Sequence, residues 1–457
     1  MKNRIVLFIA GCCALLLSSC LKSDDTQVEL SRDCQILSFS LSNDSIPELA
    51  NAVFTIDQVT GRIFNLDSLP YGTKLDEKVI CTVKLASTVI GCQVLQEATG
   101  DTISWNLEDS LDFSKPVKFI NTLWDGTTTK AYLAQVNIHQ VVPDSMIWNI
   151  YKEGIASEAI KDEKVVVFED GNTESYYLYT QPADAGRSYQ LYRSAVSDGR
   201  SWTNLTVTGL PVGEVLLSQL AVYEGNLYVP TTKGALYRSA DGQAWTAVEN
   251  VPMIKALMGA IEVGDDISGS QKSALAAVVD QSGSLAYASM NQSGEWNTGT
   301  NLNDGFPLSG FAAYSHDIMY RTHLLAVAGR DKDNKLTNAV WSTDDGMEWV
   351  KLTEDESVSF GKQEGAAVTG YDDKLFLLNG IGETGKASSD IYLSRDGGIT
   401  WNRSDSLVMM PQEFKARGFS SIYVDGDDYM YLFGGKETGS SNVLDQIWRG
   451  RINRLAF

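Results

Sequence analysis

The stretch Ser394-Arg395-Asp396-Gly397-Gly398-Ile399-Thr400-Trp401 decides the fold, because related stretches precede it at a nearly constant spacing. Four earlier segments align with it, and each ends in a tryptophan: Trp202, Trp245, Trp296 and Trp349. Successive tryptophans are 43, 51, 53 and 52 residues apart. A repeat of nearly 50 residues that contains several short strands is typical of a β-propeller. The sequence therefore predicts an all-β chain with a propeller over residues 144–457.

The five segments share an acid or amide, a glycine and a tryptophan in that order. They span residues 197–202, 239–245, 289–296, 342–349 and 394–401. This pattern resembles the Asp-box, Ser-x-Asp-x-Gly-x-Thr-Trp, of sialidase-type propellers. The fifth copy matches every position, the fourth lacks the threonine, and the third has Asn291 in place of the aspartate. In this alignment the acids are Asp198, Asp241, Asp344 and Asp396.

Each residue type in the motif has a structural purpose. Glycine supplies the positive φ of a tight turn, and a short carboxylate accepts hydrogen bonds from the turn's own amides. The tryptophan then begins a strand and buries a large flat surface between blades. We therefore expect the four aspartates to hold turns and not to catalyse a reaction, so that Asp344→Ala and Asp396→Ala cost stability.

The repeats predict six blades and a way to close the ring. The second-to-fourth strands of the blades are expected near residues 175–205, 226–248, 273–298, 323–351, 374–403 and 429–452. Residues 146–150 resemble an orphan fourth strand, and pairing them with residues 447–452 would bury both edges. The alternative fourth strand is the segment 454–457.

Residues 34–142 predict a separate domain, an Ig-like β-sandwich. Apolar residues alternate with polar ones in short runs separated by turn signals, and residues 121–138 read as its last hairpin, folded at Asp125-Gly126. Cys34, Cys81 and Cys92 all lie in this stretch. One disulfide at most can form among them, and buried free thiols are the alternative.

The first residues resemble the signal peptide of a bacterial lipoprotein. Lys2 and Arg4 precede a short apolar stretch, and Leu17-Ser18-Ser19-Cys20 resembles a lipobox. The resemblance implies a signal peptide at 1–19, lipidation of Cys20 and a tether at 20–33. The acidic pair Asp24-Asp25 resembles the surface-export signal of Bacteroidota lipoproteins. We expect an outer-membrane protein, exposed at the cell surface and attached to the membrane by its lipid alone.

The composition limits the classes of function that this chain can have. The chain of 457 residues has 58 acidic and 37 basic residues, a net charge of -21, which argues against nucleic acid as a partner. Three histidines and the lack of a Cys-x-x-Cys pair predict no metal site, and no cofactor is predicted. There is no Gly-rich phosphate loop and no Gly-x-Ser-x-Gly elbow, so no catalytic residue is assigned.

The candidate binding residues lie at the predicted mouth of the propeller. Glu364 and Arg417 precede glycines at the start of inner strands, and Arg330 lies in a neighbouring loop. We expect Glu364 and Arg417 to be rim charges that add little to folding. Sialidases need an arginine triad and carry an Arg-Ile-Pro signature, which this chain lacks.

Overall, the chain resembles an uncharacterised family of Bacteroidota surface lipoproteins with a sandwich and an Asp-box, kelch-like propeller. The expected function is non-enzymatic binding of a glycan or a protein at the propeller mouth. The alternative is a glycan-active hydrolase on the same face, and a third class is a structural component of an outer-membrane complex.

Overall fold

The computed structural model describes residues 33–75, 79–106, 110–171, 173–184, 186–264, 271–353, 357–378 and 380–454. The predicted signal peptide, Cys20 and the predicted tether up to residue 32 lie outside these ranges. The chain forms two compact units, one that ends at Val142 and one that begins at Pro143. No helix in the described ranges is long and apolar enough to cross a membrane.

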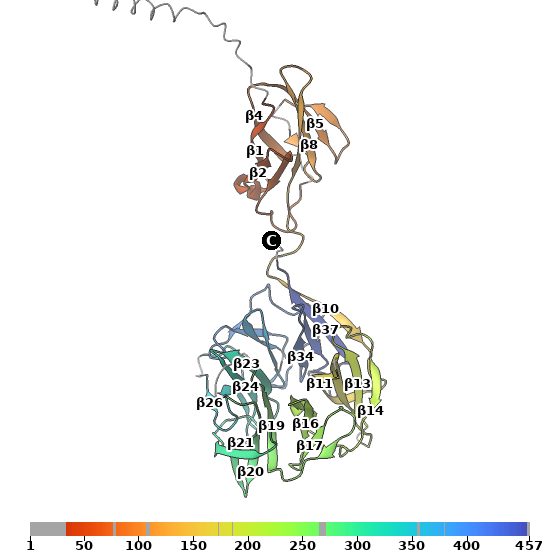
Figure 1. The fold of residues 1–457 in the computed structure, drawn as a ribbon, viewed down its shortest axis with the longest axis vertical. Coiled ribbons are helices and arrows are strands. Elements are labelled where there is room, and N and C mark those ends of the chain that lie inside the picture. Colours follow the sequence, from red (N-terminus) through yellow and green to blue (C-terminus); the bar gives the residue numbers. More distant parts are fainter. Residues whose placement is uncertain are drawn as a thin grey trace, which may run out of the picture. The chain divides into compact units, whose positions relative to one another are not determined.

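The first unit is built from two sheets that share one core (Figure 1). The smaller sheet has the order β1-β4-β7: β1 (Ile36–Ser42), β4 (Val79–Leu85) and β7 (Ser110–Leu111). The larger has the order β2-β3-β9-β8-β5-β6: β2 (Phe54–Asp57), β3 (Arg62–Asn65), β9 (Thr129–Gln135), β8 (Val117–Leu123), β5 (Val89–Gln96) and β6 (Thr102–Ser104). A short 3-10 helix, η1 (Pro47–Asn51), follows β1. The predicted last hairpin is confirmed as β8 and β9.

The alternation of side chains along these strands explains the core. In β4, Val79, Cys81 and Val83 are buried while the residues between them are exposed. The structure shows buried free thiols and not a disulfide at Cys34, Cys81 and Cys92. Burial raises the pKa of the Cys92 thiol to about 11, which keeps it protonated and unreactive at neutral pH.

Within the described residues, the second unit contains six antiparallel sheets of four principal strands. The first three are β11 (Ile160–Asp170), β12 (Thr173–Pro182), β13 (Gln190–Ala195) and β14 (Thr203–Thr206); β15 (Ala221–Tyr223), β16 (Asn226–Pro230), β17 (Leu236–Ser239) and β18 (Thr246–Ala247); and β19 (Met253–Ile261), β20 (Ala274–Gln281), β21 (Ser284–Met290) and β22 (Trp296–Asn301).

The other three sheets complete this unit. They are β23 (Ala312–Ile318), β24 (Arg321–Arg330), β25 (Leu336–Thr343) and β26 (Val350–Lys351); β28 (Ala367–Tyr371), β29 (Lys374–Leu378), β31 (Ile391–Ser394) and β32 (Asn402–Arg403); and β34 (Ser421–Val424), β35 (Met430–Phe433), β37 (Gln446–Ile452) and β10 (Met146–Glu153). Short elements accompany these sheets. One is the 3-10 turn η2 (Leu217–Gln219). Strands β27 (Gln363–Glu364) and β30 (Ile381–Gly382) extend the fourth sheet from β25, and β33 (Arg417–Gly418) and β36 (Lys436–Glu437) pair with each other.

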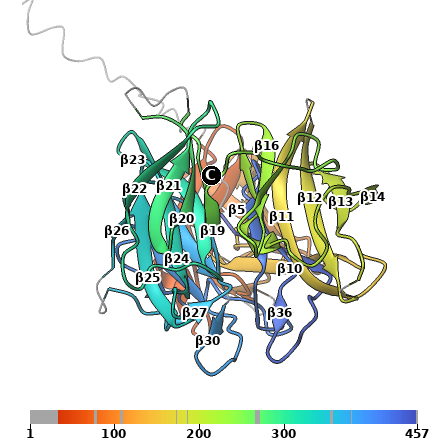
Figure 2. The same ribbon diagram turned by 90° about the horizontal axis from the view of Figure 1, so that it is seen from below.

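These sheets are arranged in a ring around one axis (Figure 1). Figure 2 shows the ring from the side. The innermost strands contact one another in the closed order β11, β15, β19, β23, β28, β34 and again β11. A separate apolar cluster lies between each pair of neighbouring sheets. Each sheet is therefore held by burial on both of its faces.

Five of these clusters each contain one of the repeated tryptophans. Trp245, Trp349 and Trp401 belong to the buried cores of their clusters, while Trp202 and Trp296 are partly buried and pack against theirs. The sixth cluster contains Trp148 and Trp448 instead. Burial of one large ring per interface explains why the tryptophan period sets the period of the sheets.

The predicted ring closure is confirmed. Strand β10 pairs with β37 in antiparallel register, with Met146 opposite Ile452 and Trp148 opposite Gly450. The Trp148 ring lies against Gly450, where an added Cβ would come within 2.6 Å of it. The first strand of the unit thus completes the last sheet. Of the alternative segment 454–457, residues 455–457 lie outside the described residues.

Each turn before a repeated tryptophan has one side chain that accepts the turn's own amides. We call these five segments the tryptophan turns. Asp241 Oδ1 accepts hydrogen bonds from the amides of Gln243 and Ala244, at 2.8 and 2.9 Å. Asp396 Oδ1 accepts one from Thr400 at 2.9 Å, and Asn291 fills the same place in the third turn. In the first turn, Asp198 accepts a bond from Ser201.

The fourth turn corrects the expectation for Asp344. Its amide acceptor is Asp345, which accepts hydrogen bonds from Met347 at 2.7 Å and Glu348 at 3.2 Å. The side chain of Asp344 instead forms an ion pair with Arg321. The sequence alignment placed the motif one residue too early, because Thr343 rather than Ser342 occupies the position of Ser394 and donates to the turn carboxylate.

We expect Asp345→Ala to lower the free energy of unfolding by about 1–2 kcal/mol, because turn amides lose their internal acceptor. Asp344→Ala is the matched control, and its exposed ion pair is worth about 0.5 kcal/mol. Urea unfolding of both variants beside wild type measures the difference. If Asp344→Ala proves the more costly change, the assignment of the turn acceptor is wrong.

Candidate functional site

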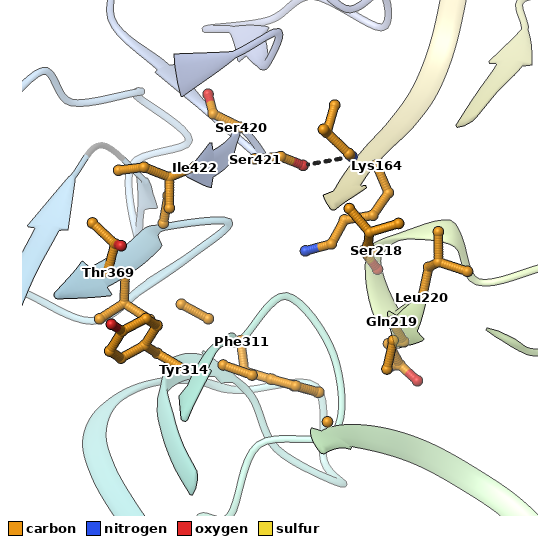
Figure 3. Close-up of a pocket in the computed structure, with 18 of the residues that line it drawn as sticks. Lys164, Ser218, Gln219, Leu220, Phe311, Tyr314, Thr369, Ser420, Ser421 and Ile422 are labelled. Carbon is orange, nitrogen blue, oxygen red and sulfur yellow. Dashed lines mark hydrogen bonds between the residues drawn. The ribbon is translucent and has the colours of Figure 1, made fainter. Parts of the chain in front are cut away.

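A central cavity of about 730 Å³ follows the axis of the ring of sheets. Its lining comes from the innermost strands of all six sheets, together with η2. It carries the side chains of Lys164, Ser218, Phe311, Tyr314 and Thr369 (Figure 3). Cavities of this size, lined by apolar walls with a few polar groups, are typical of sites for small ligands.

Lys164 has the most unusual position among the lining residues. Figure 3 shows its ammonium nitrogen directed toward the centre of the cavity. Burial lowers the pKa of this lysine, because the charged form has lost solvation. Asp162, two residues earlier on β11, forms an ion pair with Lys436 at 3.3 Å. Lys164 forms no ion pair with any described residue, although the negative charge of Asp162 partly opposes the lowering of its pKa.

The two predicted residues Arg330 and Glu364 are brought together. Their side chains form a bidentate ion pair, with Nε to Oε2 at 2.7 Å and Nη2 to Oε1 at 2.6 Å. The hydrogen bonds that Arg330 donates to Glu364 raise the pKa of its guanidinium. Glu364 lies beside the cavity, because an added Cβ on the lining residue Gly310 would be 2.8 Å from its Cβ. Each charge is satisfied by the other.

Arg417 is not on the rim, and that expectation is corrected. Its exposed fraction is 0%. The guanidinium donates hydrogen bonds to Lys415 O at 2.8 Å, Gly434 O at 3.0 Å and Gln446 Oε1 at 3.1 Å, and it lies over the ring of Phe414. Burial lowers its pKa to about 10. Arg417 thus ties β33 to the last sheet instead of contacting solvent.

Glu163 is a second ionisable residue in an unusual environment, on β11 close to the ring closure. Its exposed fraction is 5%, and Oε1 accepts a hydrogen bond from the amide of Gly435 at 3.2 Å. Burial, with a smaller contribution from the negative charge of Asp445, raises the pKa of Glu163 to about 8. Gly434 leaves room for the carboxyl group, since an added Cβ would lie 1.2 Å from Oε1.

The raised pKa of Glu163 predicts a pH dependence of stability. The native state keeps a proton that the unfolded chain releases above its ordinary pKa of 4.5, so stability falls as the pH rises from about 5 to about 8. Glu163→Gln keeps the acceptor for the amide of Gly435. We expect its free energy of unfolding to decrease between pH 5 and pH 8 by on the order of 3 kcal/mol less than that of wild type. Urea unfolding at pH 5 and pH 8 measures it. Equal pH dependence in variant and wild type would contradict a protonated Glu163.

The described residues that line the cavity do not include the groups of a sialidase site. Among the described residues around the cavity, Lys164 is the one cationic side chain and none is arginine. The two acids, Asp162 and Glu163, are consecutive on one strand, so their side chains point to opposite sides. In the same ranges of the chain, no group of three or more histidine, cysteine or acidic residues could hold a metal ion.

Comparison with known proteins identifies the family. A family model described as the DUF6242 beta propeller domain matches residues 142–457. The chain belongs to the DUF6242 family. A second family model, described as the N-terminal domain of the domain of unknown function DUF6242, matches residues 24–136. The solved structure of YjhT is similar to this DUF6242 chain at 15% identity, over 65% of this chain and 96% of that one, with a TM-score of 0.41. No curated protein matches it.

Sequence reasoning missed Lys164. Its neighbours on β11 form the run Ile160–Asp170, in which charged residues precede three valines. A lysine in the interior of an innermost strand is the available signal, since charged side chains are rarely buried without a partner. That signal requires knowing which strand is innermost, and the first strand of this blade carries no repeat motif.

Proposed function

We propose that this DUF6242 protein is a cell-surface lipoprotein that binds a glycan in the central cavity of a six-bladed propeller without cleaving it. The observation that supports this most is the cavity itself, which presents an unpaired ammonium group, hydroxyl groups and aromatic rings. A space of about 730 Å³ suits a small saccharide better than a folded protein. The six sheets and their tryptophan turns support six blades with Asp-box turns, and the two packed sheets support an Ig-like sandwich.

Two features disfavour the alternative, a glycan-active hydrolase. Glycosidases use two carboxyl groups that face the same bond. Here Asp162 is paired with Lys436, and Glu163 is directed to Gly435. Arg330 is already occupied by Glu364, so it does not offer a free cation for a substrate carboxylate.

A glycan array with the protein that begins at residue 21, run beside a hydrolysis screen of the same glycans, tests the function. We expect bound glycans and no released product. Ser218→Trp, which places an indole at an exposed lining position, should abolish binding. Val350→Trp, on the exposed β26, is the matched control and should bind like wild type. Product release that depends on the cavity would establish the hydrolase instead.

The anchor rests on Cys20 and is tested separately. We expect Cys20→Ser to remain unlipidated and to be released from membranes, because the lipid would be the protein's attachment. Metabolic labelling with a fatty acid, followed by membrane fractionation, measures both effects. Persistent labelling of the variant would show that the lipobox assignment is wrong.

A further inference from the structure

Lys164 places a positive charge inside the propeller, where the carboxylate of Asp162 attracts it without forming an ion pair. Its exposure is intermediate, it projects into the cavity, and its Nζ has no hydrogen bond or ion pair within the described part of the chain. An ammonium group that has lost part of its water is unfavourable unless an anion is near. Asp162 lies on the same side of β11, but it is bound to Lys436. A ligand that brought one negative charge would therefore be stabilised at this position.

The walls around Lys164 offer hydroxyl groups and an aromatic ring. Ser218 and Tyr314 line the cavity (Figure 3), and neither side chain forms a hydrogen bond within the described residues. Ser421 accepts a hydrogen bond from the amide of Val165 at 3.0 Å, which leaves its own proton to donate. Phe311 supplies a flat apolar surface. These groups are suited to a ligand with several hydroxyl groups and one apolar face.

We propose that Lys164 binds the carboxylate of a small hydroxylated acid, so that the glycan recognised by this propeller carries a sugar acid. This inference rests on the proposed function and specifies its ligand. A single ammonium balances one negative charge, which favours a carboxylate over a phosphate dianion. The hydroxyl groups around Lys164 then bind the hydroxyl groups of the sugar ring. The source can be a free sugar acid or an acidic residue of an oligosaccharide.

The glycan array separates acidic from neutral ligands. We expect every bound glycan to carry a carboxylate, and reduction of that carboxylate to an alcohol should weaken binding at least tenfold. Lys164→Gln should cause a similar loss, and Lys164→Arg should retain most of the binding. Free sugar acids as competitors show whether the monosaccharide is sufficient. Neutral glycans that bind equally to wild type and Lys164→Gln would overturn the inference and leave the proposed function standing.

A second measurement does not depend on any glycan. In protein with ¹⁵N-labelled lysine, the Nζ signal that disappears in Lys164→Gln should shift saturably with sodium acetate. Sodium chloride at equal ionic strength, and neutral acetamide, should not shift it. Lys164→Gln should melt at or above the temperature of wild type, which shows that its loss of binding is not loss of folding. An unresponsive Nζ signal would overturn the carboxylate site whatever the array shows.

Discussion

Replacing Trp148 with alanine should lower the free energy of unfolding of the propeller by about 3–5 kcal/mol, the usual cost of removing a buried tryptophan. Its exposed fraction is 4%, and it packs in the cluster that also contains Trp448, between the fifth and sixth sheets. The change also leaves space beside Gly450 on the partner strand. Because β10 closes the ring, the loss should affect cooperativity as well as stability. Urea unfolding of the full chain measures both.

Ile147→Ala is the matched control for the closing strand. Ile147 lies on the same strand, but its exposed fraction is 46%, so the change should cost no more than about 1 kcal/mol. Truncation gives a second comparison. A chain that begins at residue 143 should unfold cooperatively, whereas one that begins at residue 152 lacks most of β10. Similar unfolding curves for the two truncated chains would mean that β10 does not hold the ring closed.

Arg417→Met should lower the free energy of unfolding by about 3–5 kcal/mol, because acceptors on Lys415, Gly434 and Gln446 lose a buried donor. Arg417→Lys should recover little of this, since one ammonium cannot reach three acceptors in a guanidinium geometry. Thermal and urea unfolding of both variants measure the loss. The large effect is the reverse of what a rim charge would give.

Arg330→Met is the matched control for a charge near the cavity. The side chains of Arg330 and Glu364 keep 29% and 18% of their exposure, so water can replace the lost partner. The cost should be about 1 kcal/mol or less. If Arg330→Met and Arg417→Met destabilise the protein equally, burial does not determine how much each arginine contributes to stability.

The tryptophan period predicted the arrangement of the second unit well, for a physical reason. Each repeat places one large ring in one interface between sheets, so the spacing in sequence copies the spacing in space. The closure by residues 146–150 was also predictable. The last repeat has an unpaired strand edge, and pairing it with the unpaired apolar strand at 146–150 buries the edges of both. Features repeated or paired within the sequence could be predicted.

The site depended on contacts that a sequence does not contain. Arg417 precedes a glycine as Glu364 does, yet Phe414, Gly434 and Gln446 surround it and make it a buried residue. Asp344 and Asp345 are adjacent acids, and the structure shows that Asp345 accepts the turn amides while Asp344 pairs with Arg321. Lys164 belongs to the cavity because β11 is innermost. The outcomes for Arg417 and Lys164 are set by segments far away in the chain.

The most direct test of the account is a crystal structure of the protein with a glycan selected on the array. We expect the intact glycan in the central cavity, with a carboxylate oxygen within hydrogen-bond distance of Lys164 Nζ and sugar hydroxyls facing Ser218 and Tyr314. A glycan bound to the first unit or to the outer strands of the propeller, or a cleaved glycan in the cavity, would contradict the account.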